Sequence, residues 1–129
     1  MNVTGTFEVK ITPEPPNDVV DGLALGRAQI EKRFEGALDA AGAGNMLSAG
    51  TAVQGSAAYS AIERVTGELL GKRGSFVLQH TGVMNRGESS LSISVVPDSG
   101  TGELAGIRGR MGIRIEAGKH FYDFDFELP

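Results

Sequence analysis

Five side chains that can transfer a proton or fix a ligand oxygen lie at alternate positions of otherwise apolar segments. Tyr59 and Glu63 share one segment, His80 lies in a second, and His120 and Tyr122 lie in a third. An apolar enclosure raises the pKa of a carboxyl, because the charged form loses its hydration, and so suits the carboxyl to acid–base work near neutral pH. We expect Glu63 to move the proton with His80 as its partner, while either tyrosine positions a substrate oxygen.

Lys32 stands at an inward position of another segment and changes this interpretation. An inward ammonium would keep Glu63 ionised, and the pair would then fix the register of two strands without catalysing anything. A structural role also carries more weight for His80, as a hydrogen-bonded core histidine, and for His120, as a rim residue beside a turn. The two tyrosines are chiefly large packing groups whose hydroxyls need partners.

Two other kinds of site find little support in the spacing. Glu63, His80 and His120 are three side chains that could ligate a metal, but they are far apart in the sequence, and we predict no metal. The run Ser99-Gly100-Thr101-Gly102 lacks the Lys-Ser/Thr and the helix start of a phosphate-binding loop. We interpret it as a tight turn that leads the next strand into the fold, and we predict no cofactor.

Apolar and polar residues alternate along the chain at the spacing of an all-β fold, which indicates eight strands. Six of them are residues 3–11, 25–35, 37–49, 52–69, 75–84 and 89–96, and two more are the arms of a hairpin that turns at 117–118. Residues 17–22 should form a polar loop after the cluster of Pro13, Pro15 and Pro16. Glycines should weaken the third strand, and Gly55 should interrupt the fourth.

The faces of two strands bear on the candidate site. The second strand places Ala28, Ile30, Lys32 and Phe34 on one side and charged residues on the other, so Lys32 is expected to point inward. The fourth strand sets one group of alternating residues, Tyr59, Ala61, Glu63 and Val65, opposite another, Ser60, Ile62, Arg64 and Thr66. Its pattern leaves open which group is inside.

Two hairpins have well-defined registers. A turn within residues 85–88 pairs Leu78 with Val95 and His80 with Ile93. One face of this hairpin then carries Phe76, Leu78, His80, Leu91, Ile93 and Val95.

The last hairpin, turning at Ala117-Gly118, has complementary patterns on its two faces. Its outer face sets opposite charges against each other at three places: Glu116 and Lys119, Arg110 and Asp125, and Arg108 and Glu127. Its inner face pairs Ile115 with His120, Ile113 with Tyr122, Met111 with Phe124, Gly109 with Phe126 and Ile107 with Leu128. Burial of the inner face should set the register, because it is worth more free energy than exposed ion pairs.

Eight strands without a long helix predict one all-β domain spanning residues 1–129, a closed eight-stranded antiparallel β-barrel, with a sandwich as the alternative. A barrel of this size can hold one small ligand. We expect Glu63 and His80 to anchor such a ligand in a pocket. The other expected ligand-binding residues are Lys32, Phe76, Leu78, Met111, Phe124, Phe126 and His120.

The composition of the chain limits its partners. With 12 Lys and Arg against 16 Asp and Glu, the net charge of −4 disfavours binding to nucleic acid or to anionic membranes. The chain has no cysteine, its first ten residues resemble a strand and not a signal peptide, and no apolar run is long enough to span a membrane. We therefore expect a cytoplasmic protein.

Three stretches, residues 71–80, 97–109 and 120–124, resemble the bacterial domain-of-unknown-function 3224 family. The resemblance covers nearly the whole chain and is most specific between Gly71 and Gly109. It implies an eight-stranded barrel of the allene oxide cyclase type, a form shared with plant dirigent proteins and usually oligomeric. It also implies a hydrophobic pocket for an unsaturated or cyclic molecule. The family has no settled activity, and the residues of the plant cyclase do not transfer by motif.

We expect a small-molecule-binding barrel, which could act as a cofactor-independent cyclase or isomerase on an apolar substrate. A carrier protein without catalysis and an oligomeric structural module are the alternatives. Outward Ile62, Val77 and Val96 would need a cover, which predicts a homo-oligomer, with a dimer favoured. Rim residues could close the pocket or pack between subunits, and these are Met46, Leu47 and Met84.

Overall fold

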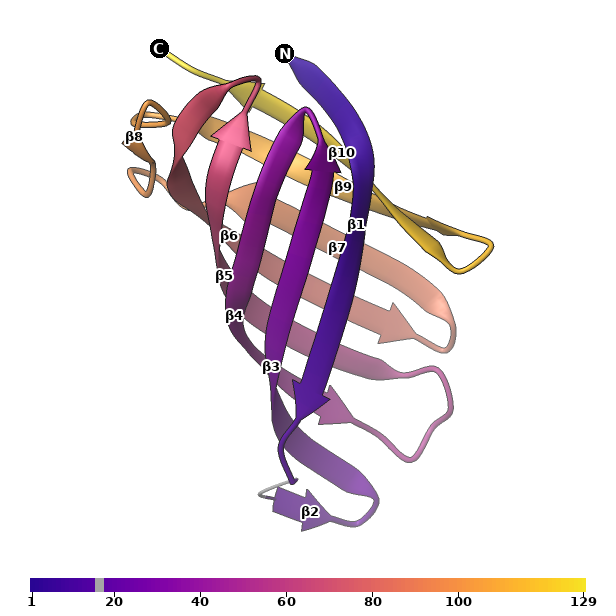
Figure 1. The fold of residues 1–129 in the computed structure, drawn as a ribbon. Coiled ribbons are helices and arrows are strands. Elements are labelled where there is room, and N and C mark those ends of the chain that lie inside the picture. Colours follow the sequence, from indigo (N-terminus) through magenta and orange to yellow (C-terminus); the bar gives the residue numbers. More distant parts are fainter. Residues whose placement is uncertain (16–17) are drawn as a thin grey trace.

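The computed structural model describes residues 1–15 and 18–129 and shows a closed antiparallel barrel (Figure 1). Its strands are β1 (Asn2–Pro13), β2 (Asp18–Val20), β3 (Leu23–Gly36), β4 (Leu38–Gly50), β5 (Ala57–Leu69), β6 (Lys72–Asn85), β7 (Glu88–Val95), β8 (Thr101–Gly102), β9 (Arg108–Glu116) and β10 (Lys119–Glu127). Eight of these strands form the ring, β2 extends the sheet beyond β3, and β8 pairs with β6. The prediction of an eight-stranded barrel is confirmed.

Closure of the barrel depends on β1, which pairs with two strands that lie far apart in the sequence. Its first half runs antiparallel to β10, from Asn2 opposite Asp125 to Phe7 opposite His120. From Gly5 onward it also pairs with β3. Because β1 joins the two ends of the sheet, the sandwich alternative is wrong.

The expected loop at 17–22 contains a short strand in its described part, so this prediction is corrected. Asp21 and Gly22 both have positive φ, 53° and 78°, and turn the chain so that β2 pairs with the start of β3. Pro16 and Asn17, which belong to the predicted proline cluster and loop, lie outside the described residues. The end of β1 is also later than expected, because its pairing continues to Pro13.

The two strands that were hardest to predict differ in opposite ways from expectation. β4 is not a weak strand, since it pairs along nearly its whole length with both β3 and β5. β5 begins only at Ala57, because residues 51–56 form a loop in which the Thr51 hydroxyl donates a 2.7 Å hydrogen bond to the carbonyl of Ser56. The inward face of β5 is the one that carries Glu63.

Both predicted hairpin registers are confirmed, with corrections at their open ends. Leu78 lies opposite Val95, and Met111 lies opposite Phe124. Leu91 and Ile115 share the predicted inner faces, but they lie near the turns beyond the packed interior, and Ile115 is 63% exposed. Leu91 is exposed as well.

The charges on the outer face of the last hairpin interact less than the register predicted. Arg108 and Glu127 form an ion pair at 3.6 Å. Glu116 pairs instead with Arg114, and Arg110 donates to the Ser92 hydroxyl at 3.3 Å. A shared register therefore places opposite charges nearby without fixing which exposed side chains meet.

The core fills the end of the barrel that carries both termini (Figure 1). Phe124 stacks between Phe76 and Phe126, with ring centroids 5.6 and 5.3 Å apart. Phe34 meets Tyr122 edge to face at 5.8 Å. The opposite end, where β4 passes into β5 and β6 turns into β7, has no such aromatic filling among the described residues and carries exposed apolar side chains.

Candidate functional site

Three ionisable side chains meet inside the barrel, one each from β3, β5 and β6. Glu63 has no exposed surface, and its Oε1 accepts hydrogen bonds from Lys32 Nζ at 2.9 Å and His80 Nε2 at 2.6 Å. The Lys32 ammonium also lies 5.2 and 5.8 Å from the ring centres of Phe7 and Phe34, where cation–π attraction supports it. A buried carboxylate is thus held between two cationic or hydrogen-bonding partners.

Two glycines of β4 make this meeting possible. Gly42 lies opposite Lys32, and Gly44 lies opposite Glu63. A Cβ at Gly42 would come within 2.5 Å of Glu63 Oε2, and one at Gly44 within 2.6 Å of the Glu63 Cα. Because neither glycine carries a side chain, Lys32 of β3 and Glu63 of β5 can reach each other across the intervening strand.

The electrostatic balance at Glu63 opposes the role first expected of it. Burial by itself raises the pKa of the Glu63 carboxyl, but the hydrogen bond from His80 and the charge and hydrogen bond of Lys32 outweigh burial and lower that pKa. Glu63 is therefore a carboxylate near neutral pH and no candidate for a general acid. The lowered pKa favours the alternative, that an inward Lys32 keeps Glu63 ionised.

One oxygen of this carboxylate is left without a partner. Among the residues that the structure describes, Glu63 Oε2 is the fully enclosed side-chain polar atom that makes no hydrogen bond. Lys32 and His80 both bond to Oε1 instead. All hydrogen bonds to the Glu63 carboxylate therefore lie on the side that faces His80 and Lys32.

Tyr59 lies beyond His80, toward the end of the barrel where β4 passes into β5 and β6 turns into β7. We call this the open end of the barrel. Its ring centre is 6.4 Å from that of His80. Tyr59 covers Gly82, where a Cβ would come within 2.3 Å of the tyrosine ring. Burial and the nearby negative charge of Glu63 raise the pKa of the Tyr59 hydroxyl, so this hydroxyl stays protonated at neutral pH.

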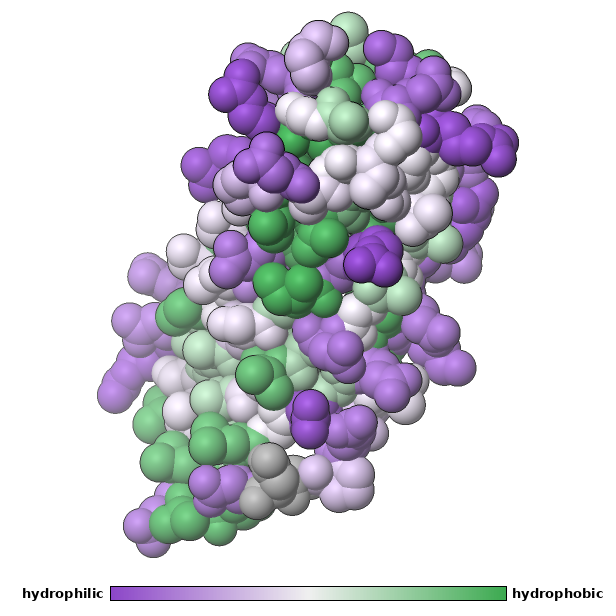
Figure 2. Space-filling view, turned by 90° about the vertical axis from the view of Figure 1, so that its left-hand side faces the viewer, coloured by the Kyte–Doolittle hydropathy of each residue, from purple (hydrophilic) through white to green (hydrophobic). Residues whose placement is uncertain are grey.

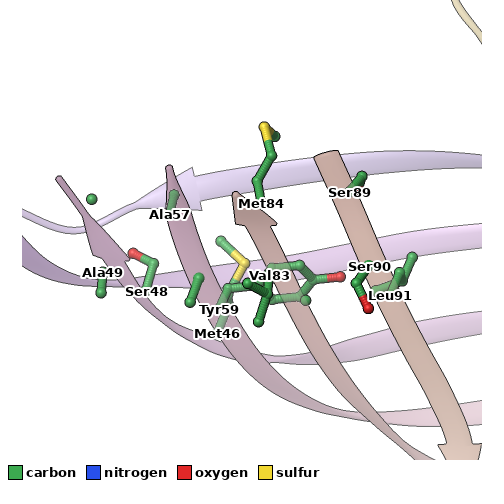
Figure 3. A pocket seen from close by; sticks show the side chains of 13 residues that line it. Met46, Ser48, Ala49, Ala57, Tyr59, Val83, Met84, Ser89, Ser90 and Leu91 are labelled. Atoms are coloured by element: carbon green, nitrogen blue, oxygen red, sulfur yellow. The ribbon is translucent and has the colours of Figure 1, made fainter. Parts of the chain in front are cut away.

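A pocket of about 370 Å³ opens on the other side of Tyr59, among the ends of β4, β5, β6 and β7 (Figure 3). Its larger side chains are apolar or aromatic, and a few serine hydroxyls are the other polar groups. The lining residues that matter below are Met46, Ser48, Ala57, Tyr59, Met84 and Leu91. The open end of the barrel is thus a hollow lined by flexible apolar groups, with one phenol at its inner side.

The chain is similar to known proteins in both sequence and structure. The family model described as "Protein of unknown function (DUF3224)" matches residues 3–126. The chain belongs to the DUF3224 family. It is also similar, at 53% identity and a TM-score of 0.96, to a crystal structure of a DUF3224 protein of unknown function from Shewanella oneidensis MR-1, covering 100% of this chain and 97% of that one. None of the curated proteins compared with the chain matches it.

The structure brings only some of the predicted site residues of this DUF3224 protein together. Tyr122 is buried, but its hydroxyl accepts from the Leu38 amide at 3.0 Å and donates to the Glu35 carbonyl at 3.0 Å. It thereby bonds to the backbone at the bend between β3 and β4, and its pKa is raised by burial. A substrate-positioning role for Tyr122 is therefore not supported.

His120 of the DUF3224 chain lies apart from Glu63 and His80. It pairs with Phe7 across β10 and β1, and the two rings are 5.1 Å apart. No group of three or more His, Cys, Asp or Glu side chains arranged to hold a metal occurs within residues 1–15 and 18–129. Across those same ranges there is also no helix with the length and apolar character needed to cross a membrane.

The aromatic pocket expected from the sequence is filled. Phe76, Leu78, Met111 and Phe124 are almost completely buried against one another and their neighbours, and Phe126 is buried beside them. The cause is that large inward side chains of several strands lie at the same level and occupy the lumen. A ligand-binding role for these five residues stays a prediction that their packing does not favour.

Sequence reasoning found part of the observed pocket and missed the rest. It named Tyr59 as a candidate and expected Met46 and Met84 at a rim. It missed Ser48 and Ala57, which are small residues in segments without a strong apolar signal. The available signal was their alternation with Met46 and Tyr59 along β4 and β5, which places them on the same face.

Proposed function

We propose that this DUF3224 protein binds a small apolar molecule at the open end of its barrel. The observation that supports the proposal best is the pocket between Met46, Tyr59, Met84 and Leu91, in a barrel whose other end is filled. Methionine side chains adapt to ligands of irregular shape, and a single phenol can fix the orientation of one polar ligand group. The likeness to an allene oxide cyclase barrel remains an expectation that agrees with such a ligand.

Filling the mouth of the pocket tests this proposal. Ala57 is exposed on the inner side of β5 and lines the pocket, whereas Ala43 is exposed on the outer side of β4 and does not. With 1-aminoanthracene as a neutral apolar probe, Ala57→Phe should weaken binding at least tenfold in a fluorescence titration. Ala43→Phe should leave it within twofold, and equal affinities for the two variants would refute the location.

A second candidate function is isomerisation or cyclisation by acid–base catalysis. The 2.6 Å bond between Glu63 and His80 Nε2 favours it, because a carboxylate that accepts one ring N–H fixes the tautomer and leaves the other nitrogen, Nδ1, as a base. His80 does not line the pocket, so in this scheme Tyr59 swings aside and His80 then removes a proton from an activated carbon of the ligand and returns it at another. Glu63 acts as a positioning residue and stays ionised.

Two variants separate the enzyme from the carrier once a converted ligand is found. In the enzyme, His80→Ala should abolish turnover while affinity stays within a few fold, and Glu63→Gln should lower kcat more than it changes KM. A carrier has no turnover, so in a carrier the two variants can change only the affinity for the ligand. Unchanged turnover in His80→Ala would exclude the acid–base scheme.

A further inference from the structure

The outer surface of β4, β5, β6 and β7 carries a continuous block of twelve residues without a charge, which we call the uncharged face. The strand registers place these residues in three rows across the four strands. The rows are Asn45, Ile62, Gln79 and Ser94; Leu47, Ser60, Thr81 and Ser92; and Ala49, Ala58, Val83 and Ser90. Ten of them are exposed, and Leu47, Ile62 and Val83 expose 61%, 51% and 48% of their surface.

The rest of the barrel exterior is built differently. Where β1 meets β3, outward Glu8 lies opposite Arg33 and Lys10 lies opposite Glu31. The last hairpin likewise sets charges against charges, as at Arg110 and Asp125. Figure 2 shows green and white surface along the middle of the molecule and much of the purple surface at its flanks; the green at the lower end lies at the height of β2.

Uncharged residues gather on this face even though charged residues are common in the chain. Lys, Arg, Asp and Glu make up 22% of the sequence, and the face is bordered by Arg64 on β5 and Arg110 on β9. Strand pairing does not require these outward residues to be uncharged, because outward positions on the other strands of the same barrel carry charged side chains. The absence of charge is therefore a property of this surface, typical of one that is covered.

The solvent-accessible area gives independent support. The chain exposes 7878 Å², whereas a monomeric protein of its 13.5 kDa exposes about 6,500 Å². The excess of about 1,400 Å² is larger than the roughly 800 Å² that each partner buries in a stable interface of ordinary size. A single copy thus has more surface than its mass accounts for, as expected of a subunit.

We infer that the uncharged face is the contact surface between two copies of this chain related by a two-fold axis. The net charge of −4 makes two copies repel each other, and the uncharged face is where that repulsion is weakest. A two-fold interface sets the same surface against itself, so a patch without charge is self-complementary in a way that a patch of one sign is not. A nucleic acid or an anionic membrane would need cations that this face lacks.

The geometry favours face-to-face packing over most of this surface. β4, β5 and β6 are hydrogen-bonded along both sides and offer no free edge to an extended peptide, whereas β7 pairs with β9 only at Ile93 and Ser94. Small and β-branched outward side chains allow two sheets to approach closely. The inference does not rest on the proposed ligand, because eight of the twelve residues lie outside the pocket; the third row, Ala49, Ala58, Val83 and Ser90, borders both.

Light scattering after size-exclusion chromatography tests the inference directly. At 100 µM the protein should elute with a mass of about 27 kDa, twice the 13.5 kDa of the chain. Thr81→Glu, in the central row, should raise the dimer dissociation constant at least tenfold, because it sets two carboxylates within one interface. Ser60→Glu, at the neighbouring position of the same row, provides a second variant should the first fold poorly.

The matched control is Thr66→Glu, which places the same charge at an exposed outward position of β5, beyond the bordering Arg64 and outside the uncharged face. It should leave the dimer intact, and circular dichroism should show all variants folded. A wild-type mass of 13.5 kDa would overturn the inference. So would a dimer that Thr81→Glu and Ser60→Glu leave intact, or one that Thr66→Glu dissociates to the same extent.

Discussion

Glu63 shows how neighbouring groups decide what a buried carboxyl can do. Its position on an apolar face predicted a raised pKa and a role in proton transfer, yet Lys32 and His80 hold it as a carboxylate. Removing one partner of a buried ion pair leaves an uncompensated charge and costs more than the pair contributes. The interior of this barrel is therefore sensitive to the loss of Lys32.

Lys32→Met should lower the free energy of unfolding by about 3–5 kcal/mol, because it leaves the Glu63 carboxylate buried with only His80 beside it. Lys10→Met, which removes an exposed lysine from β1, should change that free energy by less than about 0.5 kcal/mol. Urea unfolding monitored by circular dichroism measures both. Equal effects of the two substitutions would show that the Lys32–Glu63 pair does not matter for stability.

The lowered pKa of Glu63 makes stability depend on pH in a defined direction. Its ionised form is favoured in the folded state, so its contribution is complete above the ordinary glutamate pKa of about 4.3 and is lost as pH falls through the lower folded value. The difference in unfolding free energy between wild type and Glu63→Gln should therefore shrink from pH 7 to pH 3. A difference that stays constant or grows on acidification would contradict the ionised state.

The two tyrosines that the sequence treated alike should respond differently to loss of their hydroxyls. Tyr122→Phe deprives the buried Leu38 amide of its acceptor and should cost about 1–3 kcal/mol of stability. Tyr59 is half-buried and lines the pocket, and Tyr59→Phe should cost little. Thermal unfolding of the two variants decides between them, and similar melting temperatures would argue against a structural role for the Tyr122 hydroxyl.

At the scale of elements, two-residue turns of one kind make four of the hairpins in the sheet. In each, a residue with positive φ precedes a glycine with positive φ, and the pairs are Asp21-Gly22, Leu70-Gly71, Arg86-Gly87 and Ala117-Gly118. This geometry matches the twist of antiparallel strands and favours glycine at its second position. The turns therefore fix the registers that bring distant side chains to one level of the barrel.

Gly118→Ala isolates the backbone contribution of one such turn. A Cβ at Gly118 would meet nothing within 4 Å, but φ is 78°, so the substitution should cost about 1–2 kcal/mol through conformation alone. Gly50→Ala is the matched control, because a Cβ there is equally free of contacts and φ is not in the left-handed region. Thermal denaturation should show a lower melting temperature for Gly118→Ala only, and equal values would refute the turn assignment.

Local pattern predicted these elements better than it predicted the site they build. Turn chemistry and two-residue alternation were enough for the hairpins at 86–87 and 117–118, since their partners are neighbours in sequence. The meeting of Lys32 and Glu63 was weighed as a possibility, but it depends on Gly42 and Gly44 of an intervening strand. Those glycines were interpreted as weakening β4. The room that they leave for Lys32 and Glu63 becomes evident only once β3, β4 and β5 are aligned.

At the scale of the whole molecule, side-chain volume divides the barrel into a filled end and an open end. Alternation identifies which side chains point inward, but not how far they fill the lumen. Phe76, Phe124 and Phe126 were therefore predicted to line a pocket, and in the structure they stack on one another. The hollow lies instead at the other end, where inward residues such as Ser48 and Ala57 are small.

The methionines offer the most direct test of where this barrel binds an apolar molecule. Met46 and Met84 line the open end, Met111 is buried in the filled end, and Met1 is exposed at the terminus. In a titration with 1-aminoanthracene, monitored by NMR of ¹³C-methyl methionine, the Met46 and Met84 signals should shift while those of Met111 and Met1 stay in place. A shift of Met111 alone, or no shift of any methyl at millimolar probe, would contradict the account.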